Sequence, residues 1–323
     1  MQTSTTHVLI IHNRPTTYVA TLRAQFPQLR FETCHDPESY AALDPTFRPV
    51  VIMAFHLTEM PNALSREIAL GEQVKWVQVG GAGFDFIMPR PQDAGFVTNC
   101  SGVLSEFLAE TMIGMLLAMN FRILEFIQQQ RERRWHQITW TSVQGKTVLI
   151  VGLGNVGRAV ARRCKQFGMH VIGLRRSRTA TPEVDEQINF DGLYDALARA
   201  DFVCLHTPLT PETHHLIGAE ALKTMQPHAI LLNAARGAVV DEAALIAALQ
   251  QGDIAAAYLD VLETEPLPAS SPLWEMPNVI ITPHVADWVE DWEQRFYDFF
   301  AANLARWLAS EPLLNVVDVA RGY

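Results

Sequence analysis

A glycine-rich turn between an apolar run and a helix-like stretch is the feature that most restricts the fold of this sequence. The run 148–151 leads into Gly152-Leu-Gly154-Asn-Val-Gly157, which has the spacing GxGxxG. After a strand and before a helix, such glycines permit a tight turn, close approach of a pyrophosphate and close helix–strand packing. The helix N-terminus then offers amide donors to the phosphates. The pattern predicts dinucleotide binding by Gly152, Gly154 and Gly157, with a structural glycine turn as the alternative.

Short apolar runs alternate with helix-like stretches on both sides of this turn. The expected strands are 7–11, 49–55 and 75–79, followed by 147–151, 170–174, 202–205, 229–233, 255–260 and 279–282. The clearest helical stretches between them are 157–167 and 242–251, and 287–309 has helical periodicity near the C-terminus. Such alternation is typical of parallel sheets, and the later series predicts a doubly wound domain of about six strands.

Composition excludes several classes of protein. At 323 residues the chain is long enough for two domains, and its formal charge of −10 disfavours nucleic acid as a partner. Four scattered cysteines without a CxxC pair indicate a reducing compartment, and the N-terminus lacks the features of a signal peptide. The apolar segment 103–127 carries charges that are costly in a bilayer, so we interpret it as a buried or interfacial helix. We therefore expect a cytoplasmic protein without membrane contact.

The charge is unevenly distributed along the chain. Residues 133–182 contain ten Lys/Arg and no Asp or Glu, whereas the remaining residues carry 15 basic and 35 acidic side chains. This basic segment predicts an anionic ligand nearby, with a solvated basic face as the alternative.

The end of the strand after the glycine loop bears on the choice of cofactor. An NAD site places Asp or Glu about 20 residues beyond the loop, to bind the ribose 2′-hydroxyl. This chain has Arg175, Arg176, Ser177 and Arg178 there instead. Guanidinium and hydroxyl groups suit a 2′-phosphate, which a carboxylate would repel. The sequence therefore predicts NADP in preference to NAD, with use of either cofactor as the alternative.

Three polar residues downstream could carry out chemistry beside a nicotinamide. They are Arg236 in Asn233-Ala-Ala-Arg-Gly, Glu265 in Asp260-Val-Leu-Glu-Thr-Glu-Pro, and His284 in Thr282-Pro-His. An arginine can hold a 2-keto acid and polarise its carbonyl oxygen, a histidine can transfer the proton, and a glutamate can hold that histidine charged. Taken singly, each residue is as readily an ordinary surface or structural group.

With these motifs and His206-Thr-Pro-Leu-Thr-Pro-Glu-Thr213, the chain resembles the D-isomer-specific 2-hydroxyacid dehydrogenases over about residues 75–285. The arginine cluster resembles their NADPH-dependent glyoxylate/hydroxypyruvate reductase-like branch. The resemblance implies Arg236, Glu265 and His284 as catalytic residues, and Gly81, Ala82, Gly83 and Arg236 as substrate-binding residues. The further cofactor-binding residues that it implies are Asn155, Val156, Thr207, Pro208, Thr213, Ala234, Ala235 and Asp260.

The sequence departs from the family pattern after His284, where Val-Ala-Asp-Trp288 replaces a small residue followed by glycine. Trp288 is a candidate wall of the substrate pocket, together with Phe55 and His56, with core packing as the alternative. His214 and His215 are adjacent and lack spaced ligand partners, so no metal site is expected.

We therefore expect an α/β fold of two doubly wound parallel-sheet domains. A Rossmann domain at 101–287 would bind NAD(P), inserted into a flavodoxin-like substrate domain made of 1–100 and 288–323. The expected activity is NADPH-dependent reduction of small 2-keto acids to D-2-hydroxy acids, in a homodimer formed through the 103–127 helix. The alternatives are a nucleotide-sensing interaction protein without turnover, and an NAD-linked dehydrogenase of another small acid, such as formate or phosphite.

Overall fold

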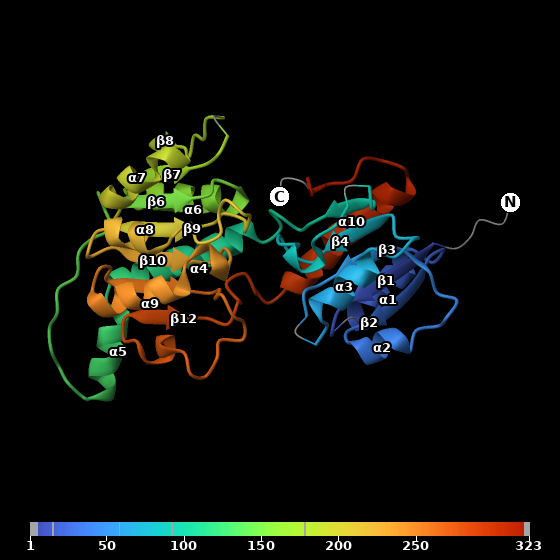
Figure 1. Cartoon of the computed structure of the whole chain (residues 1–323), viewed down its shortest axis with the longest axis horizontal. Helices are drawn as coiled ribbons and strands as arrows, with labels where there is room; N and C mark the ends of the chain where they lie inside the picture. The colour runs from blue at the N-terminus through green and yellow to red at the C-terminus, as the bar shows by residue number, and fades with distance from the viewer. Residues whose placement is uncertain (1–5, 15, 58, 92, 178, 320–323) are drawn as a thin grey trace. The chain divides into compact units, whose positions relative to one another are not determined.

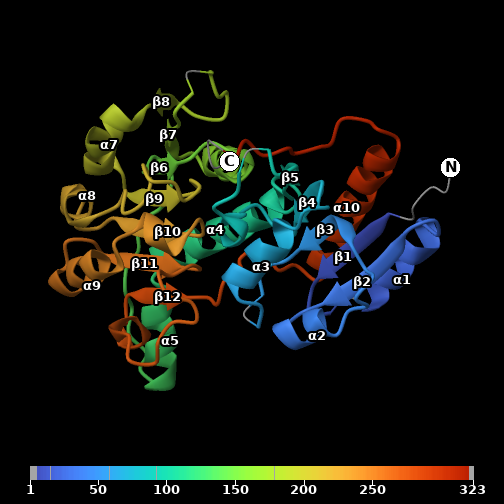
Figure 2. The same ribbon diagram turned by 45° about the vertical axis from the view of Figure 1, so that its right-hand side comes forward.

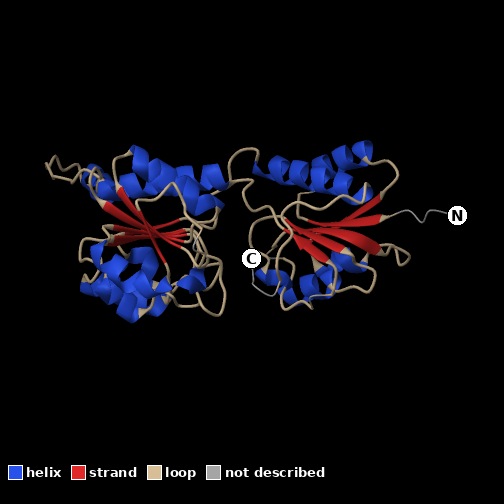
Figure 3. Cartoon of the chain, turned by 90° about the horizontal axis from the view of Figure 1, so that it is seen from above, coloured by secondary structure: helices blue, strands red, loops and turns tan. Residues whose placement is uncertain are grey.

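The computed structural model describes residues 6–14, 16–57, 59–91, 93–177 and 179–319. The chain divides into two compact units, of which the first combines Met1–Leu104 with Val289–Tyr323 and the second is Ser105–Trp288 (Figure 1). Each unit has its own parallel sheet with helices on both faces (Figure 3). The expected α/β fold with two doubly wound sheets is confirmed.

The first unit contains a five-stranded sheet in the order β2-β1-β3-β4-β5, which is the flavodoxin order. Its strands are β1 (His7–Ile11), β2 (Arg30–Cys34), β3 (Pro49–Ala54), β4 (Trp76–Val79) and β5 (Phe96–Thr98). Its helices are α1 (Thr16–Gln25), α2 (Pro37–Ala41), α3 (Asn62–Ala69) and α10 (Trp292–Leu308), with a 3-10 turn η1 (Asp85–Ile87).

A buried polar network attaches α10 to the sheet of this unit. The Asn303 amide of α10 donates to Gln78 Oε1 at 3.1 Å, and the Thr98 hydroxyl donates to the same oxygen at 2.7 Å. Trp76 Nε1 in turn donates to Thr98 Oγ1 at 2.8 Å. Because all four side chains are almost completely buried, these bonds avoid the cost of unpaired polar groups in the core.

The second unit contains a seven-stranded parallel sheet in the order β12-β11-β10-β9-β6-β7-β8. Its strands are β6 (Thr147–Val151), β7 (His170–Leu174), β8 (Glu186–Ile188), β9 (Phe202–Leu205), β10 (Ile230–Asn233), β11 (Ala256–Leu259) and β12 (Val279–Ile281). Its helices are α4 (Ser105–Asn120), α5 (Ile123–Arg131), α6 (Asn155–Gln166), α7 (Leu193–Arg199), α8 (Ala219–Thr224) and α9 (Glu242–Gln251). Its 3-10 turns are η2 (Phe190–Gly192), η3 (Gly237–Val239) and η4 (Pro272–Glu275). The sheet order reverses direction between β6 and β9, which is where ligands bind in doubly wound folds.

Alternate side chains of each buried strand pack on opposite faces of this sheet. In β9, Phe202 and Cys204 belong to the core formed with α4 and α6, whereas Val203 and Leu205 belong to the core formed with α7, α8 and α9. Helices α8 and α9 lie side by side on the second face (Figure 2). Burial on both faces explains why these strands are continuous apolar runs in the sequence.

The expectation of one continuous helix over 103–127 is wrong. The structure has α4 and α5 instead, bent by 62° at a break between residues 120 and 123. Arg122 takes a left-handed backbone conformation with φ 61°, and its guanidinium bonds the Glu125 carboxylate and the Thr139 carbonyl. Among the described residues no single helix is long and apolar enough to cross a membrane. The bent pair α4 and α5 taken together has the length and composition of a membrane span.

Three strands, namely β2, β5 and β8, were not predicted from the sequence. All three lie at the edges of their sheets, where a strand needs no continuous apolar run. Both β5 and β8 are only three residues long, and β8 is nowhere fully buried.

Candidate active site

The glycine loop connects β6 to α6 at the carboxyl edge of the second unit's sheet. Gly152 has φ +104°, and a side chain there would meet the His206 carbonyl oxygen at 2.6 Å. A Cβ at Gly157 would come within 1.9 Å of the Gly152 carbonyl oxygen, so the helix contacts its own loop. A Cβ at Gly154, by contrast, would meet nothing within 4 Å, and the start of α6 has no side-chain cap. The open space before uncapped amides suits a phosphate group, so these residues fit a dinucleotide.

Arg175, Arg176 and Ser177 follow β7, the neighbouring strand. The Arg175 guanidinium is half-buried and donates to the Thr181 hydroxyl at 3.1 Å, whereas Arg176 pairs with Glu212 at 2.6 Å. The Ser177 hydroxyl bonds Thr179 at 2.9 Å. Arg178, also predicted for the cofactor, lies outside the described residues.

The basic segment 133–182 is largely neutralised in the folded chain. Among its described cations, seven form ion pairs with carboxylates, namely Arg134, Lys146, Arg158, Arg162, Arg163, Lys165 and Arg176. Arg175 instead has a neutral hydroxyl as its hydrogen-bond partner among the described residues. The prediction of an anionic ligand therefore applies to the end of β7 and not to the whole basic segment.

The loop after β9 holds Thr207, Pro208 and Thr213 in one tight turn. The Thr213 hydroxyl donates to the Pro208 carbonyl at 2.6 Å and accepts the Thr210 amide at 2.8 Å. A shallow hollow opens on the outside of this turn, lined by Leu209, Thr210, Pro211 and His214. The turn lies at the carboxyl edge, on the strand next to the glycine loop.

His206 at the end of β9 is a residue whose role the sequence did not reveal. Both ring nitrogens are buried, and neither has a hydrogen-bond partner within the described part of the chain. Burial lowers the pKa of His206 to about 4, so the ring is neutral. The sequence shows only a histidine after an apolar run, and the packing around it is decided by the fold.

Arg236 follows β10 and is positioned by a buried asparagine. Asn233 is buried at the strand end, where its carbonyl oxygen accepts the Ala235 amide at 3.0 Å and its amide donates to the Arg236 carbonyl at 3.1 Å. The half-buried Arg236 side chain donates to the Ala235 carbonyl at 2.7 Å. The turn thus fixes the backbone of Ala234, Ala235 and Arg236 at the carboxyl edge.

Glu265 and His284 form a hydrogen-bonded pair in the same unit. Glu265 Oε2 lies 2.8 Å from His284 Nδ1, while Glu265 Oε1 accepts the Leu262 amide at 3.0 Å. His284 has φ 56°, an uncommon conformation that is held by its amide donating to the Asp260 carbonyl at 2.9 Å. The imidazole is 47% exposed, so the ring is accessible to a ligand.

Asp260 organises the segment that carries this histidine. Its buried carboxylate accepts the Thr282 hydroxyl at 2.5 Å and the amides of Val285 and Ala286 at 2.9 and 3.2 Å. The Tyr258 hydroxyl adds a bond to Thr282 at 2.9 Å. Asp260 therefore holds the backbone on both sides of His284. Its predicted contact with a nicotinamide carboxamide stays a prediction.

The pKa values of His284 and Glu265 shift in opposite directions. The hydrogen bond from Glu265 raises the pKa of His284 above its ordinary value, against burial and the charge of Arg236, which lower it. For Glu265, burial acts to raise the pKa, but the bonds from His284 and the Leu262 amide outweigh it and lower the pKa. Both shifts of pKa favour an imidazolium ring beside a carboxylate.

The loop Gly81–Gly83 follows β4 in the first unit. The Gly81 carbonyl accepts the Cys100 amide at 2.7 Å, and the Ala82 carbonyl accepts the Asn99 side-chain amide at 2.8 Å. The two carbonyls therefore face residues 99–100. The predicted role of Gly81, Ala82 and Gly83 in substrate binding stays a prediction.

The aromatic residues considered for a substrate pocket have different surroundings. Phe55 lies in the core of the first unit, where its ring stacks on His12 at 4.2 Å between centroids. His56 is exposed and its ring lies 5.4 Å from that of Phe86. Trp288, at the end of the second unit, is 55% exposed and accessible to a ligand.

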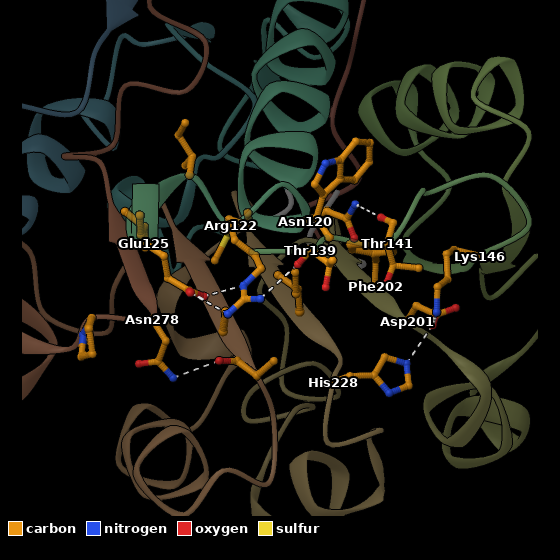
Figure 4. Close-up of a pocket in the computed structure, with 18 residues that line it drawn as sticks. Asn120, Arg122, Glu125, Thr139, Thr141, Lys146, Asp201, Phe202, His228 and Asn278 are labelled. Atoms are coloured by element: carbon orange, nitrogen blue, oxygen red, sulfur yellow. Dashed lines mark hydrogen bonds and ion pairs between the residues drawn. The ribbon is translucent and has the colours of Figure 1, made fainter. Parts of the chain in front are cut away.

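A pocket of about 450 Å³ lies at the opposite, amino edge of the seven-stranded sheet (Figure 4). The end of α4, the start of α5 and residues 139–141 line one part of it. In another part Asp201 bonds Lys146 at 2.7 Å and His228 at 2.8 Å. Because doubly wound folds bind nucleotides at the carboxyl edge, this pocket is separate from the predicted site.

Comparison with known proteins places the chain in a family. Residues 113–286 match the family model for "D-isomer specific 2-hydroxyacid dehydrogenase, NAD binding domain". A glyoxylate reductase of Korarchaeum cryptofilum is 40% identical over 230 residues, which cover 69% of each chain. The chain belongs to the D-isomer-specific 2-hydroxyacid dehydrogenase family, and the resemblance seen in its sequence is confirmed.

Two solved structures share both units. A family member of Xanthobacter autotrophicus in complex with NADPH and MES has a TM-score of 0.83 and 32% identity, covering 99% of this chain and 100% of that one. An NADPH-dependent glyoxylate/hydroxypyruvate reductase of Sinorhizobium meliloti, in complex with NADP and sulfate, has a TM-score of 0.85 and 27% identity, covering 98% and 100%.

Proposed function

We propose that this chain reduces small 2-keto acids of the glyoxylate and hydroxypyruvate kind to D-2-hydroxy acids, with NADPH as reductant. The observation that carries the proposal is the Glu265–His284 hydrogen bond of 2.8 Å, in the unit that also holds Arg236 and the glycine loop. Relatives named glyoxylate reductase and glyoxylate/hydroxypyruvate reductase support this choice of substrate.

The cofactor would be held at the carboxyl edge of the second unit's sheet. The residues assigned to it are Gly152, Gly154, Asn155, Val156, Gly157, Arg175, Arg176, Ser177, Arg178, Thr207, Pro208, Thr213, Ala234, Ala235 and Asp260. The open space at Gly154 and the neutral partner of Arg175 support a phosphate-bearing ligand, and related structures contain NADPH or NADP. NAD is the weaker alternative. When bound, the dinucleotide supplies the hydride.

His284 would supply the proton. Its Nδ1 is engaged by Glu265, which leaves Nε2 to donate to the keto oxygen as negative charge develops there. The raised pKa of His284, caused first by the Glu265 bond, favours the charged form of the ring that this step needs. Arg236 would bind the substrate carboxylate and stabilise the same developing charge.

The assignment is tested by following absorbance of NADPH and NADH with glyoxylate, hydroxypyruvate, pyruvate and a bulkier 2-keto acid. Fast turnover with NADPH and slow turnover with NADH is the expected result. Binding of NADPH without turnover of any keto acid would refute the reductase assignment and favour a nucleotide-sensing protein.

We further propose a homodimer formed through the α4–α5 region. Several large apolar side chains there face solvent in the single chain, and Trp135 is 97% exposed. The others are Phe121, Ile127 and Trp140. The Phe121 and Trp140 rings contact each other at 5.3 Å between centroids, and exposed aromatic side chains are typical of protein interfaces.

The proposal also assigns a role to each domain and a cellular location to the protein. Residues 1–100 with 288–323 would form the substrate domain and 101–287 the nucleotide domain. The match of the NAD-binding family model to 113–286 supports this division. We propose a cytoplasmic location, which the four free, buried cysteines support.

A further inference from the structure

The ion pair between Arg176 and Glu212 joins the two loops that flank the glycine loop. Strand β6 lies between β7 and β9 in the sheet, and Val151 at its end is in register with both Leu174 of β7 and Leu205 of β9. Arg176 lies two residues beyond the end of β7, and Glu212 lies in the turn after β9. Their side chains approach to 2.6 Å. The pair therefore links the segments on either side of the predicted pyrophosphate site.

Hydrogen bonds fix the backbone at both ends of this ion pair. On the β9 side, the Thr213 amide donates to the Thr210 carbonyl at 3.0 Å, and the Thr210 amide donates to the Thr213 hydroxyl at 2.8 Å. These bonds close the turn that carries Glu212. On the β7 side, the side-chain amide of Gln187 in β8 donates to the Ser177 carbonyl at 3.2 Å. The two charged side chains therefore extend from ordered turns towards each other.

The ion pair is exposed, so another anion can replace the carboxylate. The Arg176 and Glu212 side chains are 47% and 66% exposed. Exposed pairs contribute little stability, because water screens the charges and two long side chains must be ordered. A phosphate monoester carries more negative charge than a carboxylate and can accept two hydrogen bonds from one guanidinium group. A ribose 2′-phosphate can therefore displace Glu212 from Arg176, whereas a neutral 2′-hydroxyl cannot.

We propose that Glu212 is a specificity-determining residue for the cofactor, which competes with the 2′-phosphate of NADP for Arg176. NADP has to exchange the carboxylate for its own phosphate, so the acid weakens NADP binding. NAD leaves the ion pair intact, so the acid does not change NAD binding. Glu212 therefore moderates the preference for NADP that the arginines after β7 supply. This proposal rests on the proposed function, because it assumes that the ribose 2′ position lies at the end of β7.

The test is calorimetric titration of the full chain with NADP and with NAD, in the absence of a keto acid. Glu212→Gln keeps the size of the side chain and removes its charge. The variant should bind NADP about 2- to 5-fold more tightly, as expected when an exposed ion pair no longer has to be broken, and NAD with unchanged affinity. The matched control is Asp195→Asn, which removes the same charge from an exposed pair with Arg199 at 3.0 Å. The control should leave both affinities unchanged.

A double-mutant cycle shows whether Glu212 acts through Arg176. In an Arg176→Ala background, Glu212→Gln should no longer tighten NADP binding, because the arginine for which the two anions compete is absent. A gain in NADP affinity that persists without the arginine would overturn the proposal. Equal changes in NADP and NAD affinity in Glu212→Gln would overturn it as well, because they would show that the acid does not distinguish the two cofactors.

The titration separates this proposal from the proposed function, because it requires no turnover. If keto acids are reduced with NADPH but Glu212→Gln leaves the ratio of NADP to NAD affinity unchanged, only the role of Glu212 is overturned. If Glu212→Gln tightens NADP binding as expected but no keto acid is reduced, the role of Glu212 is supported and the reductase assignment fails. A wild-type protein that binds no NADP would overturn both.

Discussion

Replacing Glu265 by glutamine removes the charge that holds His284 protonated while keeping the size of the side chain. The hydrogen bond joins atoms 2.8 Å apart, and bonds to charged groups contribute about 1.5–3 kcal/mol. Because Glu265 is 36% exposed, solvent screening favours the lower end of this range. A loss of about 1.5 kcal/mol of transition-state stabilisation corresponds to a roughly 10-fold decrease in kcat/KM at neutral pH.

The pH profile gives the sharper measurement. Keto-acid reduction needs a protonated His284, so the rate should fall as the pH rises through the pKa of His284. Glu265 raises that pKa, and Glu265→Gln should therefore move the alkaline limb of the profile to lower pH. The assay is kcat/KM for glyoxylate with NADPH across the pH range in which the protein stays folded.

Glu263→Gln is the matched control for this experiment. Glu263 lies two residues away, is similarly exposed at 33%, and bonds a different imidazole, His215 Nε2, at 2.6 Å. Its substitution should leave the alkaline limb in place. An unchanged limb in Glu265→Gln, in protein with an unchanged melting temperature, would refute the proposed role of the pair.

Three further predictions follow from other parts of the fold. Arg175→Asp should lower kcat/KM for NADPH by about 10- to 100-fold through loss of a charge-assisted bond, with NADH unchanged or improved; equal losses with both cofactors would contradict the 2′-phosphate role. Gly157→Val should destabilise the fold by about 1–3 kcal/mol or more in denaturant unfolding, because a Cβ there meets the Gly152 carbonyl oxygen at 1.9 Å; an unchanged midpoint would contradict this packing. Trp135→Glu should shift the sedimenting species towards the monomer mass of 36.2 kDa, whereas the control Trp274→Glu, at a site 55% exposed, should not. A wild-type protein that already sediments as a monomer would refute the proposed dimer.

The strands of the second unit were predictable because they are buried on both faces. Six of its seven strands appear in the sequence as apolar runs, and the observed bounds differ from the expected ones by one residue or not at all. Strand β8 was missed because an edge strand pairs on one side only and can keep polar residues such as Glu186 and Gln187. The helix break at Arg122 was missed because it depends on contacts with Thr139, 17 residues away.

The sequence by itself determined the dinucleotide-binding turn and the residue types of the candidate site. Both are local patterns, since the glycine spacing and the strand–turn–helix order lie within one short stretch. Only the tertiary structure decided that Glu265 lies 2.8 Å from His284 and that Asp260 holds the segment that carries this histidine. It also buried the His206 ring without a hydrogen-bond partner among the described residues. These relations depend on how distant strand ends meet at one edge of a sheet, which no periodicity in the chain encodes.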